Sequence, residues 1–203
     1  MRAKRVLLAG AAAVAGVVLW LRKNPFPCPY SQRFWVEAPH PLITRQRLRE
    51  ILEARPGERV LEVGPGTGYY TLDVAEWVKP DGQVDILDIQ QEMLDHTMRS
   101  AAERGLLNVI PTEADATAMP YEDRTFDAAF LVTVLGEIPD EDAALRELSR
   151  VLCPGGRLVV GELVYDPHYV RLAPLRLSAS GAGFAFERRV GSGLGYFALF
   201  SKG

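Results

Sequence analysis

Three glycines that alternate with single residues follow a short apolar segment of this 203-residue chain. Residues 60–68 read VLEVGPGTG, so that the acid Glu62 stands near the end of the apolar segment, two residues before the turn begins at Gly64. A hydrophobic strand that breaks into a glycine turn before a helix lets backbone N–H groups approach a ligand closely. The dinucleotide fingerprint is G-x-G-x-x-G, whereas this turn is G-x-G-x-G with Tyr69 at the last fingerprint position. The Tyr69 side chain would obstruct the helix–strand packing that a third glycine allows, which disfavours NAD.

A second polar residue, Asp88, ends the next apolar segment twenty residues after Gly68. In a doubly wound sheet the carboxyl ends of strands one and two are neighbours, so Asp88 can accept hydrogen bonds from a ribose. Asp88 can also cap the helix that starts near Gln91. The two roles are compatible, and the glycine turn nearby favours the ribose role.

The elements that must position these residues alternate between strand and helix. Strands are predicted over Arg59–Val63, Gln83–Leu87, Asn108–Pro111, Thr125–Val132 and Gly156–Leu163, and helices over Leu42–Ala54, the residues after Gly68 to about Val78, Gln91–Arg104 and Asp140–Leu152. Apolar periodicity and turn or cap residues carry these assignments. The alternation predicts an α/β fold with a doubly wound, Rossmann-like sheet that is covered on both faces.

The pattern changes after Asp166. A helical stretch near Leu172–Ser180 is followed by two strand-like segments, Phe184–Val190 and Leu194–Ser201, which Gly191-Ser192-Gly193 joins. Two strands joined by such a short glycine-rich turn predict a hairpin. We therefore expect a mostly parallel sheet with an antiparallel C-terminal hairpin strand at its edge.

Five motifs in consistent order and spacing resemble the class I S-adenosylmethionine-dependent methyltransferases. They are Val60–Gly68, Leu87–Leu94, Glu113–Ala116, Phe126–Phe130 and Arg150–Gly156. The chain is most similar to the subgroup that includes the ubiquinone/menaquinone-type C-methyltransferases. The resemblance covers about Arg59 to Leu163. Each motif alone is weak evidence, but five in register are specific.

The resemblance implies S-adenosylmethionine as the cofactor and assigns residues to it. The methionine portion would be surrounded by Glu62, Gly64, Gly66, Thr67 and Gly68. Asp88 would hold both ribose hydroxyls, and Ile89 would pack on the adenine, whose edge would be bound by Asp115 and the Ala116 N–H. Thr133 would lie beneath the reacting methyl. Relatives that methylate amines or nucleobases carry Asp or Asn in a proline motif after strand four. This chain has VTVLG at residues 132–136, which argues against such acceptors.

Methyl transfer from a sulfonium is an in-line displacement with an activated leaving group, so the protein mainly positions the reactants and excludes water. A hydroxyl or carbon-acid acceptor also needs a base. The catalytic candidates near the ends of strands four and five are His168, Glu162 and Glu137, together with Asp166 and Tyr165. His168 could equally be a turn histidine that is hydrogen-bonded to backbone, and His40, which lies between prolines, also stays open.

Composition limits the classes of function. A formal charge of −3 argues against a nucleic-acid partner, which would require a basic stripe. The two cysteines, Cys28 and Cys153, indicate neither a disulfide framework nor a metal site, as expected in a reducing compartment. With 48% apolar residues, the chain can bury one substantial core, which predicts one catalytic domain over residues 42–203.

The first 23 residues differ from the rest of the chain. A basic cluster at 2–5 precedes an uncharged apolar run from Val6 to Leu21, and Arg22-Lys23 closes it. The run is about 16 residues, at or below the roughly 17–25 that span a bilayer, but flanking Arg and Lys can snorkel. We predict that residues 1–23 are a membrane anchor. A cleaved signal peptide and a buried helix are the alternatives.

Residues 24–41 form a distinct proline-rich and aromatic-rich stretch. It holds five prolines, together with Phe26, Tyr30, Phe34 and Trp35. Proline at this density argues against a helix and favours an extended spacer. The aromatic residues either pack on the domain or at lipid headgroups, or form a lid over an apolar substrate.

These features together predict a membrane-anchored S-adenosylmethionine-dependent methyltransferase that acts on a hydrophobic small molecule or lipid. Because this cofactor is made in the cytosol, the catalytic domain should face the cytoplasm. One alternative is methylation of a soluble small metabolite, and another is a catalytically silent assembly module. The intact Gly64, Asp88 and Asp115 argue against the silent module.

Overall fold

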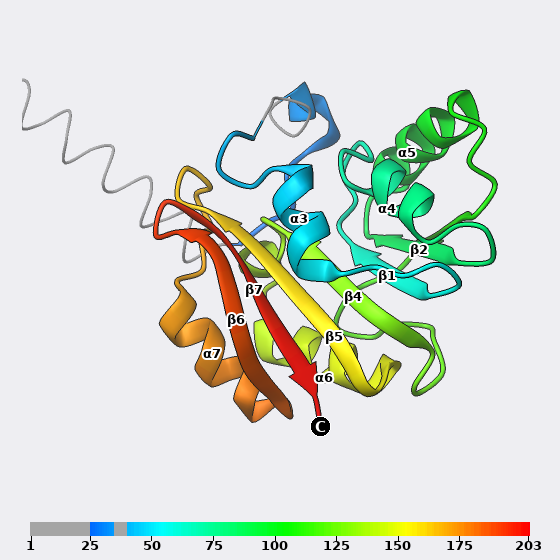
Figure 1. Ribbon diagram of the computed structural model, residues 1–203. Helices are drawn as coiled ribbons and strands as arrows, with labels where there is room; N and C mark the ends of the chain where they lie inside the picture. The colour runs from blue at the N-terminus through cyan, green and yellow to red at the C-terminus, as the bar shows by residue number, and fades with distance from the viewer. Residues whose placement is uncertain (1–24, 35–39) are drawn as a thin grey trace, which may run out of the picture.

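The strand–helix alternation of the sequence folds into a seven-stranded sheet in the order β3-β2-β1-β4-β5-β7-β6 (Figure 1). The computed structural model describes residues 25–34 and 40–203. Its strands are β1 (Arg59–Val63), β2 (Gln83–Asp88), β3 (Val109–Glu113), β4 (Phe126–Val132), β5 (Leu152–Leu163), β6 (Phe184–Ser192) and β7 (Gly195–Lys202). Strands β1 to β5 pair in parallel, and β7 is antiparallel to both of its neighbours. The predicted fold class and the C-terminal hairpin at the sheet edge are confirmed.

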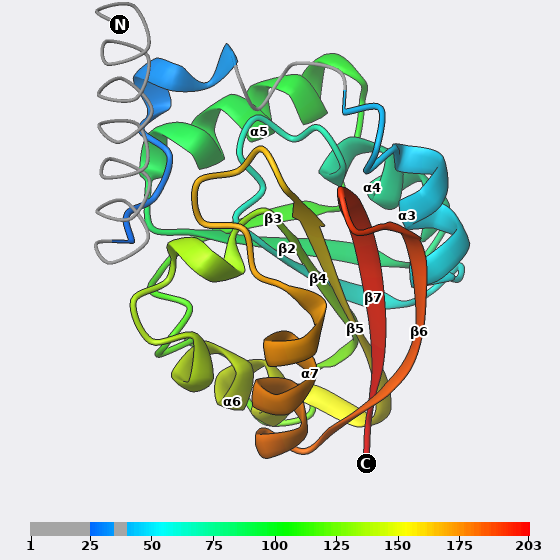
Figure 2. The same cartoon turned by 90° about the vertical axis from the view of Figure 1, so that its left-hand side faces the viewer.

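Helices cover both faces of this sheet. They are α3 (Arg45–Leu52), α4 (Thr71–Trp77), α5 (Gln91–Glu103), α6 (Glu141–Val151) and α7 (Leu172–Gly181), with short 3₁₀ turns η1 (Tyr30–Gln32) and η2 (Leu135–Glu137). Figure 2 shows α3, α4 and α5 on one side of the sheet and α6 and α7 on the other. This three-layer arrangement lets each strand bury side chains on both faces.

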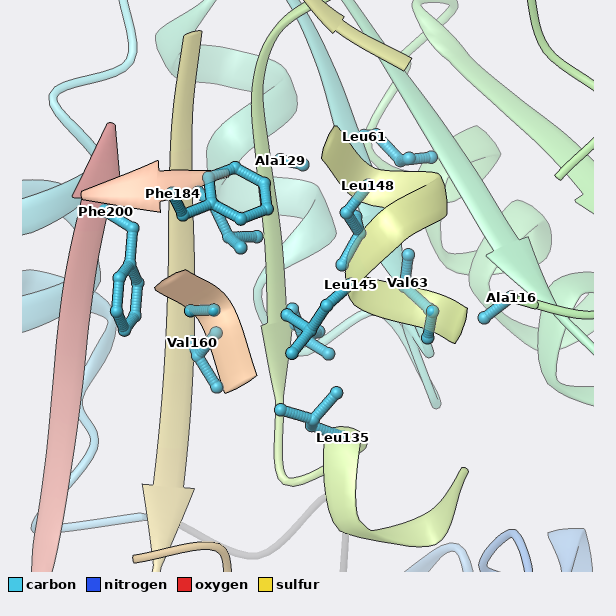
Figure 3. Packing of buried hydrophobic residues seen from close by; sticks show 14 of the residues in the cluster. Leu61, Val63, Ala116, Ala129, Leu135, Leu145, Leu148, Val160, Phe184 and Phe200 are labelled. Atoms are coloured by element: carbon cyan, nitrogen blue, oxygen red, sulfur yellow. The ribbon is translucent and has the colours of Figure 1, made fainter. Parts of the chain in front are cut away.

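The pleat of the strands divides the core into two clusters. Leu61 of β1 packs with α6 and α7 residues, whereas its neighbour Val60 packs with residues of α3, α4 and α5. Figure 3 shows Leu145 and Leu148 of α6 pointing onto the first of these faces. Both leucines are essentially fully buried. The sheet is thereby held rigid beneath the loops at its carboxyl edge.

Several boundaries differ from the prediction. Helix α3 begins at Arg45, three residues later than predicted, because the Thr44 side chain caps it by accepting a hydrogen bond from Arg47 N at 3.2 Å. Strand β3 continues to Glu113, which pairs with Asp88 of β2. The proline-rich stretch is not wholly extended, since Pro29 caps the 3₁₀ turn η1.

The predicted anchor, residues 1–23, and Trp35 lie outside the described residues. Within residues 25–34 and 40–203, every helix is too short or too polar to cross a bilayer. The anchor therefore stays a prediction from the sequence.

Candidate functional site

The glycine turn after β1 lies at the carboxyl edge of the sheet, between β2 and β4. Gly64 N donates a 2.8 Å hydrogen bond to Leu87 O, the residue before Asp88. Gly64 has a φ of +69°, in the left-handed region that glycine adopts without strain. A β-carbon at this position would overlap the side chain of Val134 in the loop after β4. The turn thus brings backbone from three strand ends together.

A cavity of about 250 Å³ opens beside this turn. Seven of the ten predicted cofactor residues line it, namely Gly64, Gly66, Asp88, Ile89, Asp115, Ala116 and Thr133. They come from four separate loops at one edge of the sheet. The structure therefore brings together residues up to 69 positions apart that the sequence assigned to one ligand.

Asp88 presents a buried carboxyl group to this first cavity. Its side chain is only 8% exposed, and its Oδ1 accepts a 2.9 Å hydrogen bond from Gln90 N. Burial raises the Asp88 pKa to about 6, although hydrogen bonds from the Gln90 and Ile89 backbone oppose this. Gln90, rather than Asp88, occupies the N-cap position of α5. Asp88 thus shapes the loop before the helix and can accept hydrogen bonds from a ligand's hydroxyl groups.

The other end of the first cavity combines an apolar surface with a polar edge. Ile89 is 55% exposed although it is a large apolar residue, which suits the face of a flat ring. Asp115 Oδ1 accepts hydrogen bonds of 2.8 Å from the backbone N and the hydroxyl of Thr117, which orient its carboxylate. Arg150 holds the same loop by donating to Met119 O and Tyr121 O. The loop is therefore held in a defined position at this end of the first cavity.

The three remaining predicted cofactor residues lie elsewhere. Glu62 is buried and accepts a hydrogen bond from the Thr71 hydroxyl, and burial raises its pKa to about 8. It lines a second cavity instead of the first. Thr67 and Gly68 are not among the lining residues of either cavity. Gly68 allows close packing, since a β-carbon there would lie 3.1 Å from Thr97 Cγ2 of α5.

The second cavity, of about 630 Å³, has mostly apolar walls and adjoins the first. Its walls include Phe26, Ile43, Tyr69, Tyr70 and Leu163. Cys28, Gly64, Val132, Thr133 and Glu137 line both cavities. Thr133, at this boundary, has a φ of +55°, a strained conformation for a β-branched residue. Two ligands in these cavities would meet at Thr133 and Glu137.

Glu137 is the acid at that boundary. Its Oε2 accepts a 3.2 Å hydrogen bond from Cys28 N. Burial, and then the charge of Asp166, raise the Glu137 pKa to about 8. Gly136 makes this position possible, because a β-carbon there would overlap the backbone carbonyl of His168. The turn η2 thereby packs directly against the loop after β5.

That loop brings a histidine to the second cavity. The His168 backbone N donates a 2.7 Å hydrogen bond to Asp166 Oδ1, and its ring packs edge-on against Phe26 with the centroids 5.3 Å apart. His168 Nε2 is buried and has no hydrogen-bond partner among the described residues. His168, Asp166 and Tyr165 all line the second cavity. The turn role and a role in the site are therefore both compatible with this histidine.

Glu162, the third predicted catalytic residue, is not among the lining residues of either cavity. Its side chain is buried, and its Oε2 accepts a 3.0 Å hydrogen bond from Val170 N. Burial raises the Glu162 pKa well above its ordinary value. The position of Glu162 supports the loop that carries His168, and a catalytic role for it stays a prediction.

Some site residues carry no signal in the sequence. Cys28 and Gln90 lie at the first cavity; Cys28 belongs to no motif, and Gln90 lies within the motif Leu87–Leu94 but is assigned no role. The density of prolines and aromatic residues around Cys28 was the only indication that this stretch is more than a spacer. His40 lines the second cavity, with its ring centroid 5.2 Å from that of Tyr69.

Comparison with known sequences identifies related proteins. The model of the ubiE/COQ5 methyltransferase family matches residues 39–169. The ubiquinone/menaquinone biosynthesis C-methyltransferase UbiE of Teredinibacter turnerae is 41% identical over 114 residues, which are 56% of this chain and 46% of the relative. The chain spans about half the length of the curated relatives it matches.

Comparison with solved structures gives the same fold. An S-adenosylmethionine-dependent methyltransferase from Aquifex aeolicus superposes with a TM-score of 0.78 at 23% identity, over 86% of this chain and 98% of that protein. The [4+2]-cyclase SpnF superposes with a TM-score of 0.69 at 25% identity, over 78% and 79% of the two chains. Because this fold carries more than one chemistry, the site has to decide the function.

Proposed function

The chain belongs to the ubiE/COQ5 methyltransferase family, and we propose that it transfers a methyl group from S-adenosylmethionine to a hydrophobic small molecule. One observation carries the proposal. A cavity that is lined by most of the predicted cofactor residues shares a wall with a larger apolar cavity, and the acid Glu137 lies at the boundary between them. A methyl donor and a methyl acceptor need this side-by-side placement.

Family membership implies S-adenosylmethionine as the cofactor, and the first cavity fits it. Gly64 and Gly66 line the first cavity without side chains, so a ligand there would contact backbone. The buried Asp88 carboxyl suits ribose hydroxyls, and Ile89, Asp115 and the Ala116 N–H suit an adenine. When bound, the cofactor supplies a methyl group on a positively charged sulfur that departs as a neutral thioether.

The residues of this chain would contribute positioning, exclusion of water and one proton acceptor. The apolar walls of the second cavity keep water from the reacting atoms. Glu137 would take the acceptor's proton on the carboxylate oxygen that does not bind Cys28 N. With a pKa of about 8, Glu137 is matched to a weakly acidic hydroxyl near neutral pH. We keep His168 as the second candidate, because it lines the same cavity.

For the acceptor we propose a quinone-type ring in its reduced, dihydroxy form that is methylated on carbon. Loss of a hydroxyl proton to Glu137 makes the adjacent ring carbon nucleophilic, and after that carbon has taken the methyl group its own proton returns to the oxygen. The curated relatives are named as ubiquinone/menaquinone biosynthesis C-methyltransferases. The aromatic rings of Phe26, Tyr69 and Tyr70 give the second cavity walls that suit a planar, apolar ring. Residues 132–136 lack the Asp or Asn in a proline motif that relatives carry when they methylate amines or nucleobases.

We further propose that the chain works at a membrane, with residues 1–23 as its anchor and the catalytic domain on the cytoplasmic side. The apolar run at Val6–Leu21 supports this. Tyr165, which lines the second cavity, is 76% exposed, so the acceptor cavity has an aromatic residue at its surface. Tyr is favoured at the boundary between lipid and water. An anchor would hold the site beside an acceptor that dissolves in the bilayer.

The test uses the full chain in mild detergent. Calorimetric titration with S-adenosylmethionine should show binding, and a titration without binding heat would contradict the methyltransferase proposal. Methyl-labelled cofactor is then incubated with a lipid extract and, separately, with a polar metabolite extract. Label in the lipid fraction supports the hydrophobic acceptor. Label in the polar fraction alone would instead support a soluble metabolite.

A further inference from the structure

Three hydrogen bonds connect the first cavity to the second through the segment that precedes the catalytic domain. Asp88 Oδ1 accepts from Gln90 N at 2.9 Å, and Gln90 Nε2 donates to Cys28 O at 3.0 Å. Cys28 N in turn donates to Glu137 Oε2 at 3.2 Å. One peptide segment is therefore bonded on its carbonyl side to the loop of Asp88 and on its amide side to Glu137.

The same segment forms part of the wall of both cavities. Pro27 and Cys28 line the first cavity, and Phe26, Cys28 and Pro29 line the second. Two further contacts attach it to the domain. The Tyr30 hydroxyl lies 3.1 Å from His96 Nδ1 of α5, and Phe26 packs against His168. Figure 2 shows η1 beside α5, above the carboxyl edge of the sheet.

We propose that residues 25–34 are a lid over both cavities, and that Gln90 is the positioning residue that clamps it with the Cys28 N–H on Glu137. The catalytic consequence rests on the proposed function. The clamp itself does not, because its hydrogen bonds join residues of this chain alone. Gln90 is the link for a geometric reason: it is bonded to Asp88 through its backbone and to the lid through its side chain.

The lid bond has a chemical effect on Glu137. A backbone N–H that donates to a carboxylate favours the ionised form and lowers its pKa. Three acids lie close enough to Glu137 to interact with its charge. Asp166 and Asp88 raise the pKa of Glu137, and Glu137 in turn raises the pKa of Glu162. The closed lid therefore has two opposing effects on Glu137: it excludes water, which raises the pKa, and it donates the Cys28 N–H, which limits that rise. It also orients the Glu137 carboxylate at the time when water is excluded.

The clamp is weak enough to open during turnover. Hydrogen bonds such as these contribute only modestly to stability, because in the open state water replaces the partner. Lids that open and close over active sites commonly do so in microseconds to milliseconds. A segment held by hydrogen bonds and ring contacts of this kind can thus admit a ligand without unfolding of the domain.

Hydrogen exchange on the full chain without any ligand tests the clamp directly. Gln90→Glu is nearly isosteric, but its carboxylate cannot donate to Cys28 O. Gln91→Glu is the matched control, since Gln91 is exposed and its Nε2 donates to Asp95 within α5. We expect amide exchange in residues 25–34 to become at least tenfold faster in Gln90→Glu and to stay unchanged in the control. Unchanged exchange in Gln90→Leu as well as Gln90→Glu would overturn the proposal.

A second readout separates positioning from a merely structural role. With a methyl-accepting extract, the pH of half-maximal rate should fall in Gln90→Leu relative to Gln91→Glu. An open lid exposes Glu137 to water and relieves the burial that is the largest cause of its raised pKa, which outweighs the loss of the Cys28 N–H donor. A change in rate without a shift in pH dependence would contradict the link to Glu137. If the chain binds no S-adenosylmethionine, the proposed function fails while the exchange result still decides whether Gln90 clamps the lid.

Discussion

The side chain of Val134 fills the space that a β-carbon on Gly64 would need. Gly64 follows β1 and Val134 lies in the loop after β4, and the two strands are parallel neighbours. The glycine is thus required twice, for its φ of +69° and for the close approach of the loop after β4. This contact closes the wall that the two cavities share.

Gly64→Ala should therefore destabilise the protein and abolish cofactor binding. Gly105→Ala is a matched control, because Gly105 has a similar φ of +66° and open space around it. The control should lose roughly 1 kcal/mol from left-handed strain alone, and Gly64→Ala roughly 2–3 kcal/mol because overlap with Val134 adds to the strain. Urea unfolding measures both. Adding Val134→Ala to Gly64→Ala should restore part of the difference, and no recovery would contradict the contact.

Asp88→Asn should weaken S-adenosylmethionine binding by roughly 10- to 100-fold, since hydrogen bonds to a charged group contribute about 1.5–3 kcal/mol. Asp95→Asn, on the exposed side of α5, should leave the affinity unchanged. Because the Asp88 pKa is about 6, its carboxylate is protonated at lower pH. The dissociation constant of the parent chain should rise as the pH falls below about 6. Calorimetry from pH 5 to 8 would show this, and a flat profile would argue against the ribose role.

Glu137→Gln should lower the rate of methyl transfer by about 100-fold or more, as expected for loss of a general base. The parent rate should increase as the pH rises toward about 8, because Glu137 must be ionised to accept a proton. S-adenosylmethionine affinity should change little by comparison. His168→Gln serves as the competing variant. A larger loss of rate in His168→Gln than in Glu137→Gln would transfer the role of base to the histidine.

The free energy of unfolding should fall as the pH rises from about 5 to 9. Glu62 is buried, and its pKa in the folded state, about 8, lies above that of an unfolded chain. At a pH between these two pKa values the folded state holds a proton that the unfolded chain has lost. The free energy of unfolding therefore falls as the pH rises through this range. Each unit of difference corresponds to about 1.4 kcal/mol, as an upper bound. Urea unfolding of Glu62→Gln should show a shallower decline, and an equally steep decline would point to other buried acids.

The sheet and most of the cofactor residues were predictable because their signals are local. Apolar strands that alternate with amphipathic helices define the fold class, and the glycine turn and Asp88 stand where strands end. The family resemblance added Ile89, Asp115 and Ala116, and all three line the first cavity. Thr67 and Gly68 belong to the same turn and line neither cavity, and Gly68 packs the turn against Thr97 of α5. Their role in cofactor binding stays a prediction.

The candidate base was harder to choose because it depends on which face of a strand a side chain occupies. Glu162 and Leu163 are adjacent in β5, so they point to opposite faces of the sheet. Leu163 lines the second cavity, while Glu162 is buried on the other face beneath Val170. Glu137 reaches the boundary of the cavities only because Gly136 packs against His168.

The sequence by itself determined the fold class, the glycine turn and the acid that follows the second strand, because hydrophobic periodicity and turn chemistry act over a few residues. Tertiary structure alone decided that Cys28 meets Glu137 across 109 positions and that Gln90 joins them to Asp88. Such contacts come from separate segments that converge on one edge of a sheet, and no local pattern records that convergence. The turn at Gly64 marks the proposed site of the methyl donor, and the packing around it determines which residues line the cavity proposed for the acceptor.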